Sequence, residues 1–291
     1  CVLRLPQELI APKRRSSMDI QLNPLEREGQ PVISKNGQYI AIGNTNQIDI
    51  YDSDINLVRS VSLPGTRPYG NYAVAGISVD ASDVYIRSWN GYLSAAGGLH
   101  KINTKNGTIS RLDVDENGST VTYQGWSLDA RDIDFTSDYS KAVIAIRDTA
   151  DSRSWGDQRV NIYLKDLYSG LLKRIDFVSN DSEMGFSSNP EISNDGDKVV
   201  FSSDLDLTAT GASGRNLYLW KANNSFELIN KKKNGEVFTS NYGWHADISG
   251  DGNKIVFQTH DSLDPNDRNG TCDIYIKDLE TGNFTRVSND A

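Results

Sequence analysis

The sequence predicts an all-β protein assembled from several similar four-stranded antiparallel sheets. Three observations predict it: a ten-residue phrase that recurs along the chain, period-two alternation of apolar and polar residues, and short turn signals at matching places. The phrase is clearest as ISNDGDKVVF at 192–201 and ISGDGNKIVF at 248–257. Related copies are ISKNGQYIAI (33–42), ISVDASDVYI (77–86) and FTSDYSKAVI (135–144).

The five copies define a repeat of nearly constant length. Placing Ser34, Ser78, Thr136, Ser193 and Ser249 in register gives spacings of 44, 58, 57 and 56 residues. Periods of this size are typical of repeat arrays and propellers. We expect the repeats to cover about residues 31–63, 74–114, 132–178, 189–230 and 245–289.

Each repeat is expected to contain four strands in order. The first two flank the S-x-D-G-like turn of the phrase, where Gly196 and Gly252 suit a two-residue bend with positive φ. After a longer loop comes an alternating third strand: QIDIYD (47–52), GLHKIN (98–103), VNIYLKD (160–166), NLYLWKA (216–222) or DIYIKDL (273–279). Short turns such as LYSG (167–170) and LETG (279–282) then lead to a fourth strand.

A single four-stranded meander leaves both of its faces and both of its edges open. Several such sheets bury their faces by packing around a common axis, which is the β-propeller arrangement. We therefore predict a β-propeller over residues 31–291, each sheet forming one blade. The period-two alternation excludes a helical solenoid.

The repeats resemble the TolB-type, WD-repeat-like β-propeller repeat of bacterial envelope and secreted proteins. The resemblance rests on S-x-D-G followed by D-x-N-G-x-x-D-I-Y-I-x-D-L-x-T-G and R-V-S, which residues 244–289 carry nearly whole. Earlier repeats depart from it, since Asn36 replaces the aspartate and Ala81 and Tyr139 replace the glycine. The resemblance implies the fold and a periplasmic, outer-surface or secreted location, but it is compatible with many functions.

The chain ends bear on the number of blades. Residues 1–30 can supply outer strands that close the ring, which would give six blades in the parent protein; a complete five-bladed ring is the alternative. An N-terminal Cys1 fits either a lipid-anchored mature protein or a fragment of a longer chain. A bridge between Cys1 and Cys272 is also conceivable.

The charge balance argues against nucleic-acid binding. The 291 residues carry a formal net charge of −9, and the basic runs Lys13–Arg15 and Lys231–Lys233 are interpreted as a solvated tail and a solvated loop. No stretch approaches eighteen consecutive apolar residues, so no transmembrane segment is expected.

The long connections of the repeats fall on one side of the propeller and form the predicted ligand-binding face, where a rigid scaffold would display them. Aromatic residues gather in them, which suits stacking on sugars or gripping a peptide. The predicted binding residues are Trp89, Tyr92, Trp126, Trp155, Tyr242, Trp244 and His245. The alternative for each aromatic ring is that it fills a gap between blades.

A second candidate site is the loop 267–273. Its D-x-N-G-x-x-D spacing places the oxygens of Asp267, Asn269 and Asp273 around a glycine turn, which suits a calcium ion. The alternative is an Asx-type turn held by side-chain to backbone hydrogen bonds. Apart from this possible calcium, no cofactor is expected.

Familiar catalytic motifs are absent from the sequence, including G-x-S-x-G, H-E-x-x-H and the Walker loop. We therefore predict a non-catalytic propeller that binds a protein or a glycan on its long-loop face. One alternative is a polysaccharide lyase or hydrolase, in which His245 or Tyr242 would act with Arg131 or Arg153. The other is an accessory propeller of a larger multidomain protein.

Overall fold

The computed structural model describes residues 31–44, 46–64, 72–88, 98–119, 133–148, 159–177, 185–211, 214–238 and 245–288. Regular structure in these ranges consists of twenty β-strands, and no helix occurs in them. The strands form five four-stranded sheets, each antiparallel throughout and each following the order of the chain. The predicted all-β class and the five predicted repeats are therefore confirmed.

The sheets are numbered here in chain order. Sheet 1 consists of β1 (Val32–Ile33), β2 (Tyr39–Gly43), β3 (Gln47–Asp52) and β4 (Leu57–Ser62). Sheet 2 consists of β5 (Tyr72–Ile77), β6 (Asp83–Ser88), β7 (Gly98–Asn103) and β8 (Ile109–Arg111). Sheet 3 consists of β9 (Ile133–Phe135), β10 (Lys141–Asp148), β11 (Arg159–Asp166) and β12 (Leu172–Arg174). Sheet 4 consists of β13 (Ser187–Ile192), β14 (Lys198–Ser203), β15 (Asn216–Lys221) and β16 (Phe226–Leu228). Sheet 5 consists of β17 (Ala246–Ile248), β18 (Lys254–Thr259), β19 (Asp273–Asp278) and β20 (Phe284–Arg286).

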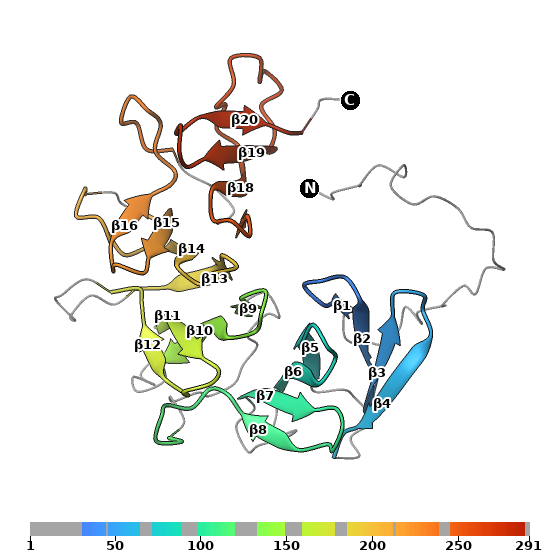
Figure 1. Cartoon of the computed structure of the whole chain (residues 1–291). Coiled ribbons are helices and arrows are strands. Elements are labelled where there is room, and N and C mark those ends of the chain that lie inside the picture. Colours follow the sequence, from blue (N-terminus) through green and yellow to red (C-terminus); the bar gives the residue numbers. More distant parts are fainter. Residues whose placement is uncertain are drawn as a thin grey trace, which may run out of the picture.

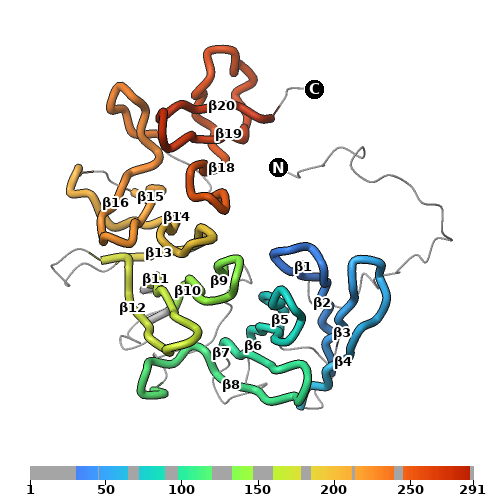
Figure 2. Tube along the Cα trace, viewed as in Figure 1, coloured from blue at the N-terminus to red at the C-terminus, as the bar shows by residue number. Residues whose placement is uncertain are grey.

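The five sheets follow one another around a common centre, as the blades of a propeller do (Figure 1). The first strand of each sheet is innermost, and β1–β5, β5–β9, β9–β13 and β13–β17 are neighbours. The trace in Figure 2 shows the same arc and places a gap between sheets 5 and 1. Because each sheet faces the next one, its apolar residues need a second sheet to cover them.

Hydrophobic cores lie between successive sheets, and side-chain alternation explains how one strand serves two of them. In β14, Val199 and Phe201 join the core shared with sheet 3, whereas Val200 joins the core shared with sheet 5. All three side chains are fully buried. Each contributes about 1.5–3 kcal/mol by leaving water, so stacking of the sheets is the main source of stability.

The recurring phrase forms the turn between the first two strands of each sheet. In sheet 4 the backbone N–H of Ser193 donates to the carbonyl of Lys198 (3.0 Å), which closes a four-residue loop. The Ser193 hydroxyl donates to Asp195 Oδ1 (2.5 Å) and accepts the N–H of Lys198 (3.1 Å). The expected two-residue bend is therefore wrong, because the hydroxyl and carboxylate together support a longer loop.

The glycine position of this turn has positive φ in every sheet. Gly196 has φ of 73° and Gly252 has φ of 66°, as expected from their lack of a Cβ. In sheets 2 and 3 the same position is held by Ala81 (φ 55°) and Tyr139 (φ 56°). The hydrogen-bonded turn is thus strong enough to hold ordinary residues in the left-handed region.

Candidate functional site

Most of the predicted aromatic face lies outside the residues that the structure describes. This applies to Trp89, Tyr92, Trp126, Trp155, Tyr242 and Trp244, and also to Arg131 and Arg153. His245 is described: it is exposed, precedes β17, and borders a hollow of about 250 Å³ that is largely apolar. The hollow lies against Val256 and Ile274, on the face of sheet 5 that points away from sheet 4.

The predicted calcium loop is held by hydrogen bonds. Asn269 Oδ1 accepts the N–H of Thr271 (2.8 Å), which is the Asx turn named above as the alternative. Asn269 Nδ2 donates to Asp273 Oδ2 (3.0 Å), and the Tyr275 hydroxyl donates to Asp267 Oδ2 (2.5 Å). These side chains therefore have partners within the protein.

Asp273 is the centre of this network. It is almost fully buried, and its Oδ1 accepts from Arg286 Nε (3.0 Å) and from the Ser288 hydroxyl. Burial alone would raise the pKa of Asp273, but the hydrogen bonds from Ser288, Asn269 and Arg286 lower it below its ordinary value. Within the described part of the chain, no three His, Cys, Asp or Glu side chains converge as metal ligands. Calcium binding here remains a prediction.

Two hollows lie beside a lysine-rich hairpin between sheets 4 and 5. Lys231 pairs with Val237, and the N–H of Lys232 donates to the carbonyl of Glu236 (2.8 Å). Gly235, with φ of 92°, forms the tight end of this hairpin. The hairpin, residues 231–237, belongs to a long connection predicted for the ligand-binding face, although its lysines were interpreted as a solvated loop.

Buried polar residues anchor the base of the lysine hairpin. Asn230 is fully buried, and its Nδ2 donates to the carbonyl of Phe238 (2.6 Å) and to Asn216 Oδ1 (2.9 Å). Its Oδ1 accepts the N–H of Leu217 (3.0 Å). Both ends of the connection are thereby fixed to sheet 4, so the lysines project from a rigid base.

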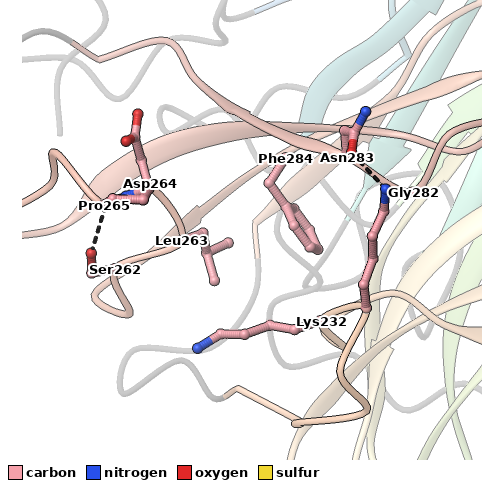
Figure 3. A pocket seen from close by; sticks show the side chains of 9 residues that line it. Lys232, Ser262, Leu263, Asp264, Pro265, Gly282, Asn283 and Phe284 are labelled. Atoms are coloured by element: carbon pink, nitrogen blue, oxygen red, sulfur yellow. Dashed lines mark hydrogen bonds between the residues drawn. The ribbon is translucent and has the colours of Figure 1, made fainter.

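Two hollows flank the hairpin. The first, of about 460 Å³, lies between the hairpin and the outer strand of sheet 5. Figure 3 shows Leu263 and Phe284 extending toward it from opposite sides, with Lys232 across from them. The second, of about 370 Å³, lies along β16 and includes Thr208. Lys232 and Lys233 border both hollows.

The lysines differ in their surroundings. Lys232 Nζ is 3.1 Å from Glu236 Oε1, and Lys233 Nζ donates to Asn283 Oδ1 (2.8 Å). Lys277, beside the second hollow, is buried and donates to the carbonyl of Ile229 (2.9 Å). Its burial lowers its pKa from the ordinary value, although it remains a hydrogen-bond donor. The hairpin therefore presents cationic donors beside walls of mixed polarity, which include the apolar Leu263 and Phe284 and also the carboxyl groups of Asp264 and Glu227. Lysines next to apolar side chains suit an anionic ligand with a nonpolar body.

Comparison with known proteins establishes the fold. No family model matches the sequence, and no curated protein matches it. A TolB structure from Agrobacterium tumefaciens shares 19% identity and a TM-score of 0.52, covering 90% of this chain and 80% of its own. Hydrazine synthase of Kuenenia stuttgartiensis gives 16% identity and a TM-score of 0.52 over 93% of this chain and 70% of that one.

A prolyl endopeptidase structure gives a TM-score of 0.55 at 13% identity, over 91% of this chain and 36% of that chain. At such identities the likeness concerns the fold: this chain has the propeller fold of TolB structures. Because proteins named as a synthase and as an endopeptidase share the fold as well, fold alone does not identify a function. Function has to be argued from the site.

Proposed function

We propose that this protein is a non-catalytic binding propeller that captures an anionic ligand, an acidic protein segment or a glycan, at the lysine hairpin. One observation carries the proposal: Lys232 and Lys233 border two hollows, and Lys231 borders the second, in a protein whose formal net charge is −9. The lysines create a local positive potential, which attracts anions even though the protein as a whole is acidic. Leu263 and Phe284 supply apolar contact next to the charge.

The acidic protein segment is the ligand that we favour. The first hollow runs along β20, the outer edge of sheet 5. In the pairing of β20 with β19, Asn283 accepts the N–H of Asp278, and Val287 donates to the carbonyl of Ile274. Hydrogen-bonded and non-hydrogen-bonded pairs alternate along an antiparallel ladder, so the N–H and C=O of Phe284 point away from β19. An extended peptide can pair with such an edge, which a sugar cannot do.

We further propose that the protein works in the bacterial envelope or exterior. The support is the fold likeness to a TolB chain together with the repeat resemblance noted in the sequence. No helix long and apolar enough to cross a bilayer occurs in the described ranges. Fractionation of cells that express the full-length protein tests the location directly.

Anisotropy titrations with a fluorescent oligoglutamate peptide and with labelled polygalacturonate test the binding proposal. The triple variant Lys231→Glu, Lys232→Glu, Lys233→Glu should weaken binding by about tenfold or more, because each exposed lysine contributes roughly 0.5 kcal/mol. Tighter binding of the peptide than of the polysaccharide supports the acidic segment, and the reverse order supports a glycan.

A matched control is Lys101→Glu, Lys105→Glu, Lys173→Glu, which changes the net charge equally at sites on sheets 2 and 3. Its affinity should stay near that of the wild type at the same ionic strength. An equal loss in both triple variants would show that binding depends on overall charge and would reject the hairpin as the site. Absence of binding to either probe would overturn the anionic-ligand proposal.

A further inference from the structure

Three carboxyl groups occupy one register position on successive inner strands. Two residues before the serine or threonine of the repeated turn, sheets 3, 4 and 5 carry Asp134, Glu191 and Asp247. The same position holds Val32 in sheet 1 and Gly76 in sheet 2. Because β13 contacts both β9 and β17, this register brings the three acids close enough for Asp134 and Asp247 to act on Glu191.

A lysine from sheet 1 reaches this group. Lys35, in the turn between β1 and β2, places its Nζ 2.7 Å from Asp134 Oδ1. The ion pair joins sheets 1 and 3, which are separated by sheet 2 in chain order. Asp134 Oδ2 also accepts the N–H of Ile192 from sheet 4 (3.1 Å), so one carboxylate links three sheets.

Glu191 lies against Asp134 in a confined place. Burial raises the pKa of the Glu191 carboxyl far above its ordinary value, and the charges of Asp134 and Asp247 raise it further. Asp247 is the more exposed of the three; burial and the charge of Asp134 raise its pKa as well. The charge of Lys35 opposes both shifts, and the backbone hydrogen bond from Ile248 also lowers the pKa of Asp247.

The other strands packed against β13 add apolar surface. Beside β9 and β17, these are β10, β11 and β14. They contribute Val143, Ile162 and Val199 to the core that contains Ile192. This core covers the Ile192 face of β13, whereas the preceding residue, Glu191, belongs to the other face. Among the described groups that act most strongly on Glu191, Lys35 is the cation and Asp134 and Asp247 are the anions. Two negative charges of this group would be left without a counter-charge if all three carboxyls were ionised.

We propose that Lys35, Asp134, Glu191 and Asp247 form an axial latch that joins sheets 1, 3, 4 and 5 and is closed when Glu191 retains its proton. In the closed form, Glu191 donates that proton in a hydrogen bond to Asp134, while Lys35 neutralises Asp134. Loss of the proton sets a second carboxylate against Asp134 and loosens the contact of the inner strands. The latch is independent of the ligand proposed for the lysine hairpin.

The pH dependence of stability tests the latch. In the unfolded chain Glu191 ionises near its ordinary value of 4.5, whereas the folded protein keeps the proton. Stability from this group is therefore complete below 4.5 and declines as pH rises toward the raised folded pKa. Glu191→Gln retains a hydrogen-bond donor to Asp134 but cannot ionise. Its stability relative to that of the wild type should therefore increase as pH rises.

The expected gain in Tm of Glu191→Gln over the wild type is small at pH 5 and grows by about 3–6 °C toward pH 8. Glu280→Gln, which removes an exposed carboxylate in a turn of sheet 5, is the control. Its plot of Tm against pH should run parallel to that of the wild type. Parallel curves for Glu191→Gln and the wild type would reject the shared proton.

Hydrogen exchange tests the mechanical part of the proposal. Lys35→Met should speed exchange of the Ile192 amide and of β2 by about tenfold, since Asp134 loses its counter-charge and sheet 1 loses its link. Lys254→Met is the matched control, because Lys254 pairs with Asp278 within sheet 5 (2.8 Å). Lys35→Arg should restore protection. Unchanged protection in Lys35→Met would overturn the latch.

Discussion

Asp273 shows how one buried carboxylate can organise the end of a sheet. It accepts hydrogen bonds from Asn269 in the preceding loop and from Arg286 and Ser288 at the end of the outer strand. The spacing of residues 267–273 predicts a side-chain network in this loop. It does not reveal Arg286 and Ser288, because these partners come from a strand 13 and 15 residues further along the chain.

Replacing Asp273 by Asn should lower the free energy of unfolding by about 1–3 kcal/mol at neutral pH, because Arg286 loses its anionic partner in a buried place. The lowered pKa of Asp273 sets the pH dependence. Its contribution is present above the ordinary value of 3.8 and is lost as pH falls through the folded value. Denaturant titrations should therefore show the difference from wild type shrinking in acid; a difference that persists there would contradict this account.

The same pair of proteins tests the calcium prediction. If Asp273 is a ligand, millimolar calcium should raise the Tm of the wild type and leave that of Asp273→Asn unchanged, because only a bound ion stabilises the folded state. A chelator should then lower the wild-type Tm. No change with either reagent would leave the Asx turn as the full explanation of the loop.

At the scale of elements, the repeated turn links one sheet to the next. Lys198 Nζ of sheet 4 donates to the carbonyl of Gly252 in the turn of sheet 5 (2.7 Å). A Cβ on Gly252 would lie 2.9 Å from Lys198 Cδ. Glycine is therefore favoured there by its positive φ and also by space, because an added Cβ would displace the flexible end of Lys198. Only the first reason can be predicted from the sequence.

Gly252→Val and Gly37→Val separate these two requirements. Both positions have positive φ, but a Cβ on Gly37 would meet nothing within 4 Å. Each variant should lose about 1–3 kcal/mol through backbone strain, and Gly252→Val should lose more because Lys198 has to move. Equal losses in denaturant titrations would show that Lys198 adjusts freely. Binding at the lysine hairpin should survive in Gly37→Val, since that turn belongs to sheet 1 and borders neither hollow.

The strands themselves were predictable because alternation and turn residues agree within each repeat. The positive φ of Ala81 and Tyr139 was not, since neither residue favours that conformation. It becomes intelligible from the surrounding bonds: Ser78 and Thr136 donate to Asp80 and Asp138, as Ser193 does to Asp195. These hydrogen bonds maintain the turn in sheets 2 and 3, where the residue at the positive-φ position is not a glycine.

For the whole molecule, sheet 5 has a face that no described sheet covers. Its Val256, Ile274 and Ile276 are partly exposed. The residues at the same positions of sheet 4 are Val200, Leu217 and Leu219, which are almost fully buried. The apolar pattern of sheet 5 is thus that of a face between blades, and it borders the gap toward sheet 1 (Figure 1).

Residues 1–30 are predicted to supply strands at this gap, and they lie outside the described part of the chain. Deleting them should lower the Tm by several degrees, on the order of 2–4 °C for each kcal/mol lost, and should speed exchange in β18 and β19. Removal of residues 289–291 serves as the control and should leave both properties unchanged. Unaltered stability after the N-terminal deletion would show that this segment does not cover the face.

The axial carboxyls and the lysine hairpin mark the limit of prediction at this scale. Asp134, Glu191 and Asp247 are readable from the aligned repeats as acids at one register position. Their convergence with Lys35 depends on how the sheets are arranged around the axis, which no single repeat encodes. Likewise, three consecutive lysines look like a solvated loop until the hollows on either side are known.

Among the described residues, two lysines that begin a second strand reach forward to the repeated turn of the next sheet. Lys141 of sheet 3 donates to the carbonyl of Asp195 in sheet 4 (3.2 Å), and Lys198 of sheet 4 donates to Gly252 in sheet 5. Each donor precedes its acceptor in the chain, so during synthesis a new turn emerges beside a sheet that can already have folded. We therefore expect that, as the chain leaves the ribosome, each of these turns meets a lysine that has already been synthesised, whereas trimming the protein from its N-terminus removes the lysine donor before the turn that accepts from it.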